Sequence, residues 1–134
     1  MQTIGFLSLR DFLAELEAEG LQLVRVQPYV KRETDKHTGL MRLHYFVLAQ
    51  AVTKGDVLVA RFHTGSAWQH EEEKVQQCEE NNQAAGEILS RHLASLGYQV
   101  RPGIIAASAQ AETLATTNLW KFEGGKLIAR ETDS

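Results

Sequence analysis

The chain has 134 residues, of which 43% are hydrophobic and 23% are charged, so it can bury one core and is short for two domains. Its formal net charge of −3 argues against a general nucleic-acid coat or a binder of anionic membranes, which usually carry an excess of basic residues. The single cysteine, Cys78, excludes an intramolecular disulfide and a zinc site built from several cysteines. No apolar run approaches the roughly 18 residues of a membrane span, and Met1–Leu9 lacks the pattern of an export signal. We therefore expect one cytoplasmic domain.

A short helix is predicted after Ser8, which can cap it, with Asp11 three residues on and Gly20 as its left-handed stop. Leu21–Val30 has the composition of a strand, and Pro28 places that strand at an edge or near a bulge. Lys31–Gly39 is charged and lacks apolar residues, so we expect an exposed connection there.

The central prediction is a long β-hairpin over residues 40–64, with its turn around Lys54-Gly55. Either a two-residue or a four-residue loop places Val52 opposite Val57. Counting from that pair gives one face that is apolar throughout and should face the core. Its members are Met41, Leu43, Tyr45, Val47, Ala49, Ala51, Leu58, Ala60 and Phe62.

The other face of the hairpin is apolar near the turn and basic at the open end. There His63 is expected opposite Phe46, with His44 as its diagonal neighbour. Arg42, His44, Arg61 and His63 could together hold a phosphate or a carboxylate, because guanidinium groups present a planar fork to such anions. The same side chains could instead form structural ion pairs with glutamates of the following helix. A metal site could also be drawn from His44, His63, His70 and Glu73, although their spacing matches no compact motif.

A long helix is predicted over about 67–96, because Ser66 and Gln69 form a capping-box pattern and Gly97 ends the periodicity. Asn82 occupies a position in its apolar stripe, where a buried amide can fix the register of a helix pair. Small residues midway would allow close packing on a second copy, so a homodimer is expected. The interface hypothesis names Asn82, Ala85, Leu89, Trp120 and Phe122.

The C-terminal part is predicted to contain a strand in Tyr98–Ala107, a weakly helical segment in Ser108–Thr117 and a hairpin in Leu119–Arg130. Gly124-Gly125 supplies a two-residue turn, which places Glu123 opposite Lys126. This hairpin should extend the sheet or make the dimer contact.

The order helix, three strands, long helix, strand resembles the core of the restriction-endonuclease-like nucleases. In that family an acidic residue opens the second strand, and a Glu-x-Lys pair on the third strand completes a metal site. Here Arg61 and His63 stand where Glu and Lys would be expected, and Asp56 and Glu33 are the nearest carboxylates. The resemblance therefore implies a nucleic-acid-acting domain whose catalytic motif is degenerate or absent.

These observations predict an α+β domain with a mainly antiparallel sheet around the central hairpin, one long helix packed on it, a short N-terminal helix and a C-terminal hairpin. No catalytic or cofactor-binding motif stands out. The favoured function is that of a small non-catalytic binding or accessory protein that acts as a homo-oligomer, with no cofactor and no membrane partner. The alternative is a domain that binds a phosphate-bearing ligand or acts on nucleic acid.

Overall fold

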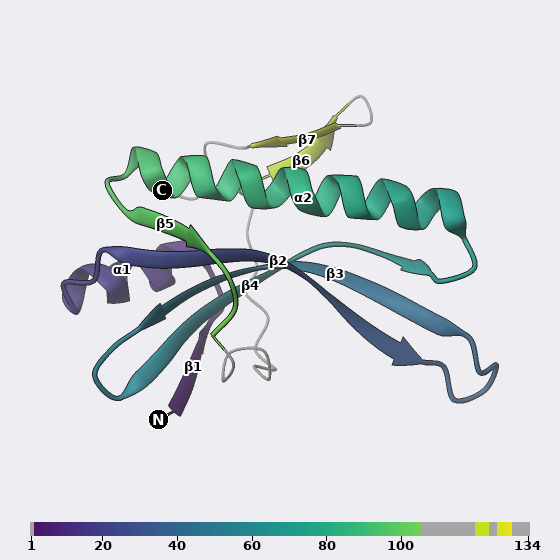
Figure 1. Ribbon diagram of the computed structural model, residues 1–134, viewed down its shortest axis with the longest axis horizontal. Coiled ribbons are helices and arrows are strands. Elements are labelled where there is room, and N and C mark those ends of the chain that lie inside the picture. Colours follow the sequence, from purple (N-terminus) through teal and green to yellow (C-terminus); the bar gives the residue numbers. More distant parts are fainter. Residues whose placement is uncertain (1, 106–119, 124–125, 130–134) are drawn as a thin grey trace.

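The computed structural model describes residues 2–105, 120–123 and 126–129, and Figure 1 shows their arrangement. Seven strands and two helices are present among these residues. In chain order they are β1 Gln2–Phe6, α1 Leu9–Ala18, β2 Leu23–Thr34, β3 Met41–Val52, β4 Asp56–Trp68, α2 Glu72–Ser95, β5 Gln99–Pro102, β6 Trp120–Glu123 and β7 Lys126–Ala129.

Five strands form one sheet in the order β1-β4-β3-β2-β5. The three long central strands are antiparallel to one another, whereas β1 runs parallel to β4 and β5 runs parallel to β2. The α+β class is thus confirmed, but the sheet is mixed and the prediction of a mainly antiparallel sheet was wrong. The helix α2 explains the second parallel pair, because it carries the chain across the sheet from β4 to the edge of β2.

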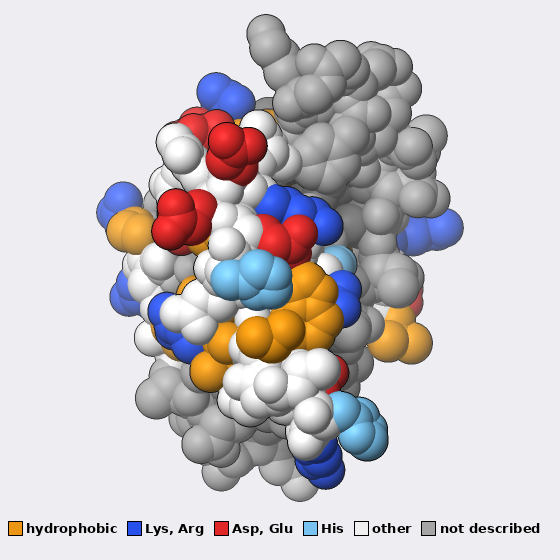
Figure 2. Space-filling view, turned by 90° about the vertical axis from the view of Figure 1, so that its right-hand side faces the viewer, with side chains coloured by type: hydrophobic (Ala, Val, Ile, Leu, Met, Phe, Trp, Pro, Cys, Tyr) orange, Lys and Arg blue, Asp and Glu red, His pale blue; other side chains and the backbone are white. Residues whose placement is uncertain are grey.

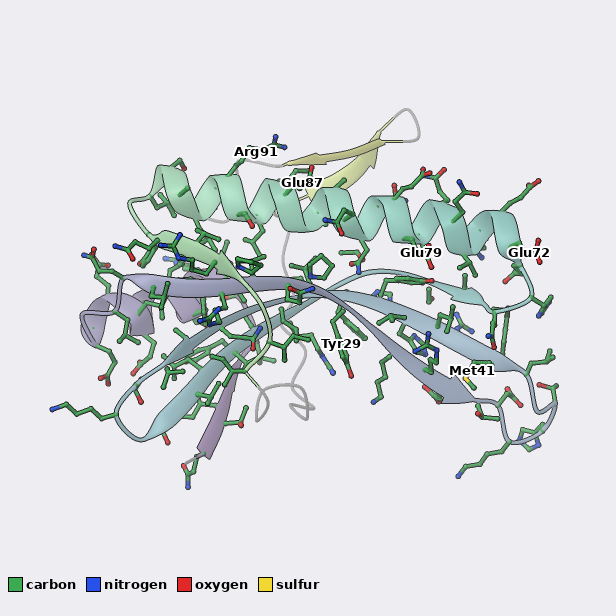
Figure 3. The ribbon with its side chains drawn as sticks, in the orientation of Figure 1. Tyr29, Met41, Glu72, Glu79, Glu87 and Arg91 are labelled. Atoms are coloured by element: carbon green, nitrogen blue, oxygen red, sulfur yellow. The ribbon has the colours of Figure 1, made fainter. Side chains whose placement is uncertain are left out.

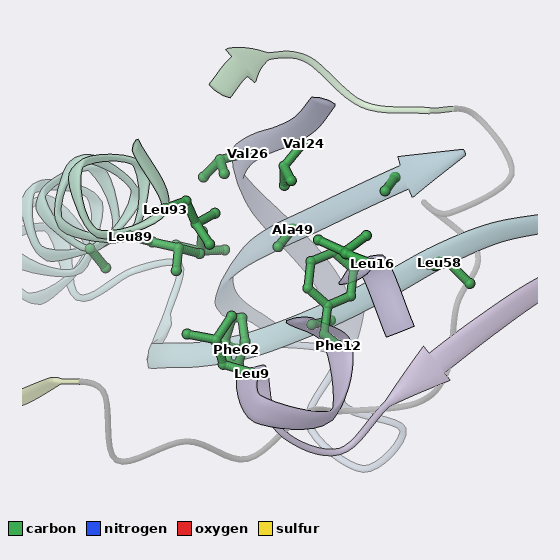
Figure 4. Packing of buried hydrophobic residues seen from close by; sticks show 14 residues of the cluster. Leu9, Phe12, Leu16, Val24, Val26, Ala49, Leu58, Phe62, Leu89 and Leu93 are labelled. Carbon is green, nitrogen blue, oxygen red and sulfur yellow. The ribbon is translucent and has the colours of Figure 1, made fainter. Parts of the chain in front are cut away.

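Both helices pack against the same face of the sheet, and Figure 4 shows the core between them. We call this the helix face. The hairpin residues that were expected to face the core do so from Val47 to Ala51 and from Leu58 to Phe62. The first helix contributes Leu9, Phe12 and Leu16, and the second contributes Ala85, Leu89 and Leu93. The N-cap prediction is confirmed as well, since the backbone N–H of Asp11 donates to Ser8 Oγ at 3.1 Å.

The register of the central hairpin is the one that the turn predicts. Val52 lies opposite Val57, and His63 lies opposite Phe46. Beyond that pair the register shifts by one residue, so that Tyr45 lies opposite Gly65 rather than opposite Thr64. Thr64 is therefore an extra residue in β4, which is the definition of a β-bulge.

Two boundaries differ from the predicted ones. β4 continues to Trp68, and α2 starts at Glu72 rather than near residue 67. Ser66 is held in the ladder opposite His44, and the backbone N–H of Trp68 donates to Glu71 Oε1 at 2.9 Å, so the expected capping box does not form. β2 runs to Thr34, because its second half pairs with β3 and draws the first part of the predicted exposed connection into the sheet.

The C-terminal strands β6 and β7 form a two-stranded sheet of their own, with Glu123 opposite Lys126 as predicted. They do not extend the main sheet. The predicted helical segment Ser108–Thr117 lies outside the described residues.

Candidate functional site: a basic sheet face

The face of the sheet opposite the two helices carries the basic residues that the sequence singled out. Arg42, His44, Arg61 and His63 all occupy outward positions of β3 and β4, and we call this set the basic face. The inward neighbours of these residues, such as Val47 and Phe62, belong to the core under α2. The long helix therefore does not cover the basic face, and its glutamates lie on the other side of the sheet.

The bulge at Thr64 adds two residues to this face. Without an extra residue, strict alternation would turn Ser66 and Trp68 toward the helix face. With the bulge, Ser66 lies opposite His44 and Trp68 lies opposite Arg42 on the outward side. Trp68 was not predicted to belong to this face because the sequence pattern assigned it to the helix.

Arg42 is held in a fixed orientation by these two neighbours. Its guanidinium carbon lies 5.1 Å from the centre of the Trp68 ring, which is a cation–π distance. One of its terminal nitrogens donates to Ser66 Oγ at 3.3 Å. Because the stacked guanidinium keeps further N–H groups, it can still donate to an incoming anion.

His44 contacts a carboxylate that the sequence analysis placed in a loop. Its Nε2 lies 3.2 Å from Glu33 Oε2. Glu33 reaches the basic face because β2 continues beyond Val30 and pairs with β3, which sets Glu33 opposite Arg42. The predicted strand ended at Val30, and for this reason Glu33 was not expected beside His44. The side chain of Glu33 is 67% exposed, so it can move away from His44 at little cost.

Arg61 and His63 form the second part of the basic face, around the ring of Phe46. The Arg61 guanidinium lies 4.6 Å from the ring centre of Phe46, and Arg61 is 6% exposed. The His63 ring centre lies 5.3 Å from that of Phe46 and 6.3 Å from that of His44. Arg61 thus contributes its charge from below the surface, whereas His63 is exposed beside His44.

The pKa of His63 reflects the positive charge of the basic face. Its pKa is lowered, first by partial burial of the ring and then by the positive charges of His44, Arg42 and Arg61. A like charge disfavours the protonated form, so these groups lie close enough to raise the local potential. An anion bound here would relieve that repulsion.

A hollow of about 280 Å³ opens at the end of the basic face. It is lined by Glu33, Asp35, Arg42, His44 and Trp68. The structure therefore brings Arg42 and His44 into one concave site, places His63 next to it, and sets Arg61 under Phe46. Figure 2 looks at this end of the molecule: acidic side chains gather in its upper part, where α2 lies, and exposed hydrophobic side chains occupy its middle.

The remaining predicted site residues lie elsewhere. Asn82, Ala85 and Leu89 are buried between α2 and the sheet of the same chain, and the side chains of Trp120 and Phe122 lie outside the described residues. Homodimer formation stays a prediction. Among the described residues, no group of three or more His, Cys, Asp or Glu side chains is arranged to hold a metal ion.

Comparison of the chain with family models, with curated proteins and with solved structures finds no match. Within residues 2–105 and the two short C-terminal strands, no helix is long and apolar enough to cross a bilayer.

Proposed function

We propose that this chain is a non-catalytic binding protein that holds a phosphate- or carboxylate-bearing ligand on its basic face. The observation that carries the proposal is the hollow in which Arg42 and His44 lie side by side with Trp68, with His63 adjacent. Arginine forks and imidazolium groups are the side chains that recognise such anions, and a ring beside them can contact the organic part of a ligand.

Pre-organisation supports this assignment. Stacking on Trp68 and the bond to Ser66 hold the guanidinium of Arg42 in place before a ligand arrives, so little conformational entropy is lost on binding. Glu33 occupies the position of the anion in the free protein, since its carboxylate contacts His44. A ligand phosphate would displace Glu33 and use the same imidazole.

Isothermal titration calorimetry with pyrophosphate, and separately with citrate as a carboxylate ligand, tests the proposal. The double variant Arg42→Gln/His44→Gln should weaken binding roughly tenfold or more, because it removes charge-assisted hydrogen bonds. Arg10→Gln is the matched control: Arg10 is an exposed residue of α1, on the other side of the sheet, and its loss should leave the affinity unchanged. Equal loss in the two variants, or no binding of either anion to the parent, would refute the proposal.

A further inference from the structure

The outer edge of β2 is only partly covered by a neighbouring strand. β2 pairs with β3 from Arg25 to Thr34, but β5 pairs with β2 only from Leu23 to Val26. In the part of the chain that the structure describes, no strand lies beside residues 27–34 on that side. An open edge presents backbone N–H and C=O groups that can pair with another strand.

Two hydrogen bonds explain why the chain leaves this edge after β5. After Pro102 it turns away from β2, and the backbone N–H of Gly103 donates to Gln27 Oε1 at 3.0 Å. Two residues later the N–H of Ile105 donates to Gln50 Oε1 at 2.7 Å. Gln50 lies on the outward side of the sheet, so these bonds lead the chain away from the edge of β2 along which β5 runs.

A groove runs along the open edge between β2 and α2. It consists of two adjoining pockets of about 510 and 200 Å³ that share Pro28 and Gln83. At the bottom of the groove α2 and β2 are in close contact, since a Cβ atom on Gly86 would lie 3.0 Å from Pro28 Cγ. We call this feature the edge groove. Its lining residues include Gln27, Pro28, Tyr29 and Pro102 from the strands, and Glu79, Gln83, Glu87 and Arg91 from α2.

The groove contains a buried polar group with no hydrogen-bond partner among the described residues. Tyr45 lines the smaller pocket and is 3% exposed, and its hydroxyl is the group in question. Burial, and then the nearby charge of Glu79, raise the pKa of Tyr45, so the hydroxyl stays protonated at neutral pH and is available as a donor. A carbonyl brought into the groove could accept its hydrogen bond.

We propose that the edge groove binds an extended peptide with basic side chains, which adds to β2 as a strand in line with β5. Backbone pairing along the open edge supplies affinity, and the α2 wall supplies selectivity, as in other strand additions. The charged residues that α2 contributes to this wall are Glu79 and Glu87 against Arg91, so the wall carries a net negative charge. Figure 3 shows Glu79 on the side of α2 that faces the sheet.

A narrow peptide fits this groove better than a second copy of the chain does. Both helices lie on one face of the sheet, so edge-to-edge pairing of two β2 strands about a twofold axis normal to the sheet would bring the two α2 helices into one layer. Their glutamates would then approach one another, and like charges across an interface are unfavourable.

The probe is a fluorescein-labelled peptide of alternating lysine and valine, about seven residues long, which is near the usual length of a strand. Binding is followed by fluorescence anisotropy. Two further peptides are methylated on every second backbone nitrogen, one at the odd positions (the odd phase) and the other at the even positions (the even phase). Each therefore lacks the N–H groups of one peptide edge and keeps the charge. We expect one phase to abolish binding and the other to retain it, because only one edge of the peptide pairs with β2.

Charge reversal on the wall gives a matched pair of variants. Glu79→Lys/Glu87→Lys changes two exposed glutamates of the edge groove, and Glu73→Lys/Glu80→Lys makes the same change in net charge at exposed positions of α2 outside it. The first should weaken binding roughly three- to tenfold, and the second should have a smaller effect. Amide hydrogen exchange of the complex should show new protection within residues 27–34.

Equal weakening by the two double variants would reveal non-specific charge attraction and overturn the proposal. So would undiminished binding of both methylated peptides, protection confined to other residues, or no binding at about 1 mM peptide. The test is independent of the basic face, since the double variant Arg42→Gln/His44→Gln leaves the edge groove intact and should bind the peptide normally.

Discussion

The hydroxyl of Thr64 donates a hydrogen bond to Asn82 Oδ1 over 2.6 Å, and this contact joins the bulge of β4 to the middle of α2. Both side chains are buried. Asn82 also donates from Nδ2 to the carbonyl oxygen of Tyr29 at 3.4 Å, so one amide connects α2 to both β4 and β2. The bulge is therefore anchored from the helix face while it sets the order of side chains on the basic face.

Removing this contact should destabilise the protein. Thr64→Val keeps the shape of the side chain but leaves Asn82 Oδ1 without its short hydrogen bond, which should cost about 1–3 kcal/mol of unfolding free energy. Urea denaturation measures the difference. Thr34→Val, at an exposed position at the end of β2, is the control and should cost much less. If the two substitutions have the same effect, the bulge is not held by Asn82.

The close approach of α2 and β2 at Gly86 makes a second prediction. Gly86→Val would place a branched side chain where even a single Cβ atom lies 3.0 Å from Pro28 Cγ, so the helix must move away from the strand. We expect a loss of about 2 kcal/mol or more in unfolding free energy. Ala94→Val, at an exposed position of the same helix, should cost well under 1 kcal/mol from helix propensity alone. Similar losses in both variants would show that this contact is not tight.

The lowered pKa of His63 makes stability depend on pH. Because the folded protein takes up this proton less readily than the unfolded chain, the contribution of His63 is intact above the ordinary histidine pKa of 6.5 and is lost as the pH falls through the lowered value. His63→Gln should therefore lose less stability than the parent between pH 8 and about pH 5. Thermal denaturation across this range measures the difference, with His37→Gln in the exposed turn after β2 as the control. Parallel curves for the parent and the His63 variant would contradict the assignment.

Glu33 should compete with the ligand of the basic face. Glu33→Gln removes the charge that contacts His44, so the affinity for pyrophosphate should rise about two- to fivefold. Calorimetry under the conditions used for the parent measures this rise, and it should shrink at high salt, which screens surface charge. Glu15→Gln, in α1, changes the net charge equally and serves as the control. An unchanged affinity in the Glu33 variant would mean that the anion does not use His44.

Local patterns were sufficient to predict much of the fold. The Lys54-Gly55 turn and strict alternation gave the correct pairs from Val52–Val57 to Phe46–His63, because register in a hairpin follows from its turn. The bulge at Thr64 could not be predicted in this way. Its extra residue, Thr64, is hydrogen-bonded to Asn82, which is 18 positions away and whose side chain approaches β4 only when the helix has packed on the sheet.

The same limit applies to β1 and to the second half of β2. Gln2–Phe6 is five residues long and pairs in parallel with β4, a contact that no local turn announces. The segment after Val30 is polar, and it becomes a strand only because β3 extends beside it. For this reason Glu33 and Trp68 were missed, whereas Arg42, His44, Arg61 and His63 were correctly expected on one face.

We propose that an anion binds where Arg42, His44 and His63 meet. The most direct measurement is an NMR titration of the His63 ring signals between pH 4 and 9, with and without pyrophosphate at constant ionic strength. We predict that pyrophosphate raises the lowered pKa of His63, because a bound negative charge stabilises its imidazolium form. At a fixed pH, the anion should move the ring signals of His44 and leave those of His37, in the exposed turn after β2, unchanged. If the pKa of His63 is the same with and without the anion, or if the ring signals of His37 move as much as those of His44, the basic face is not its binding site.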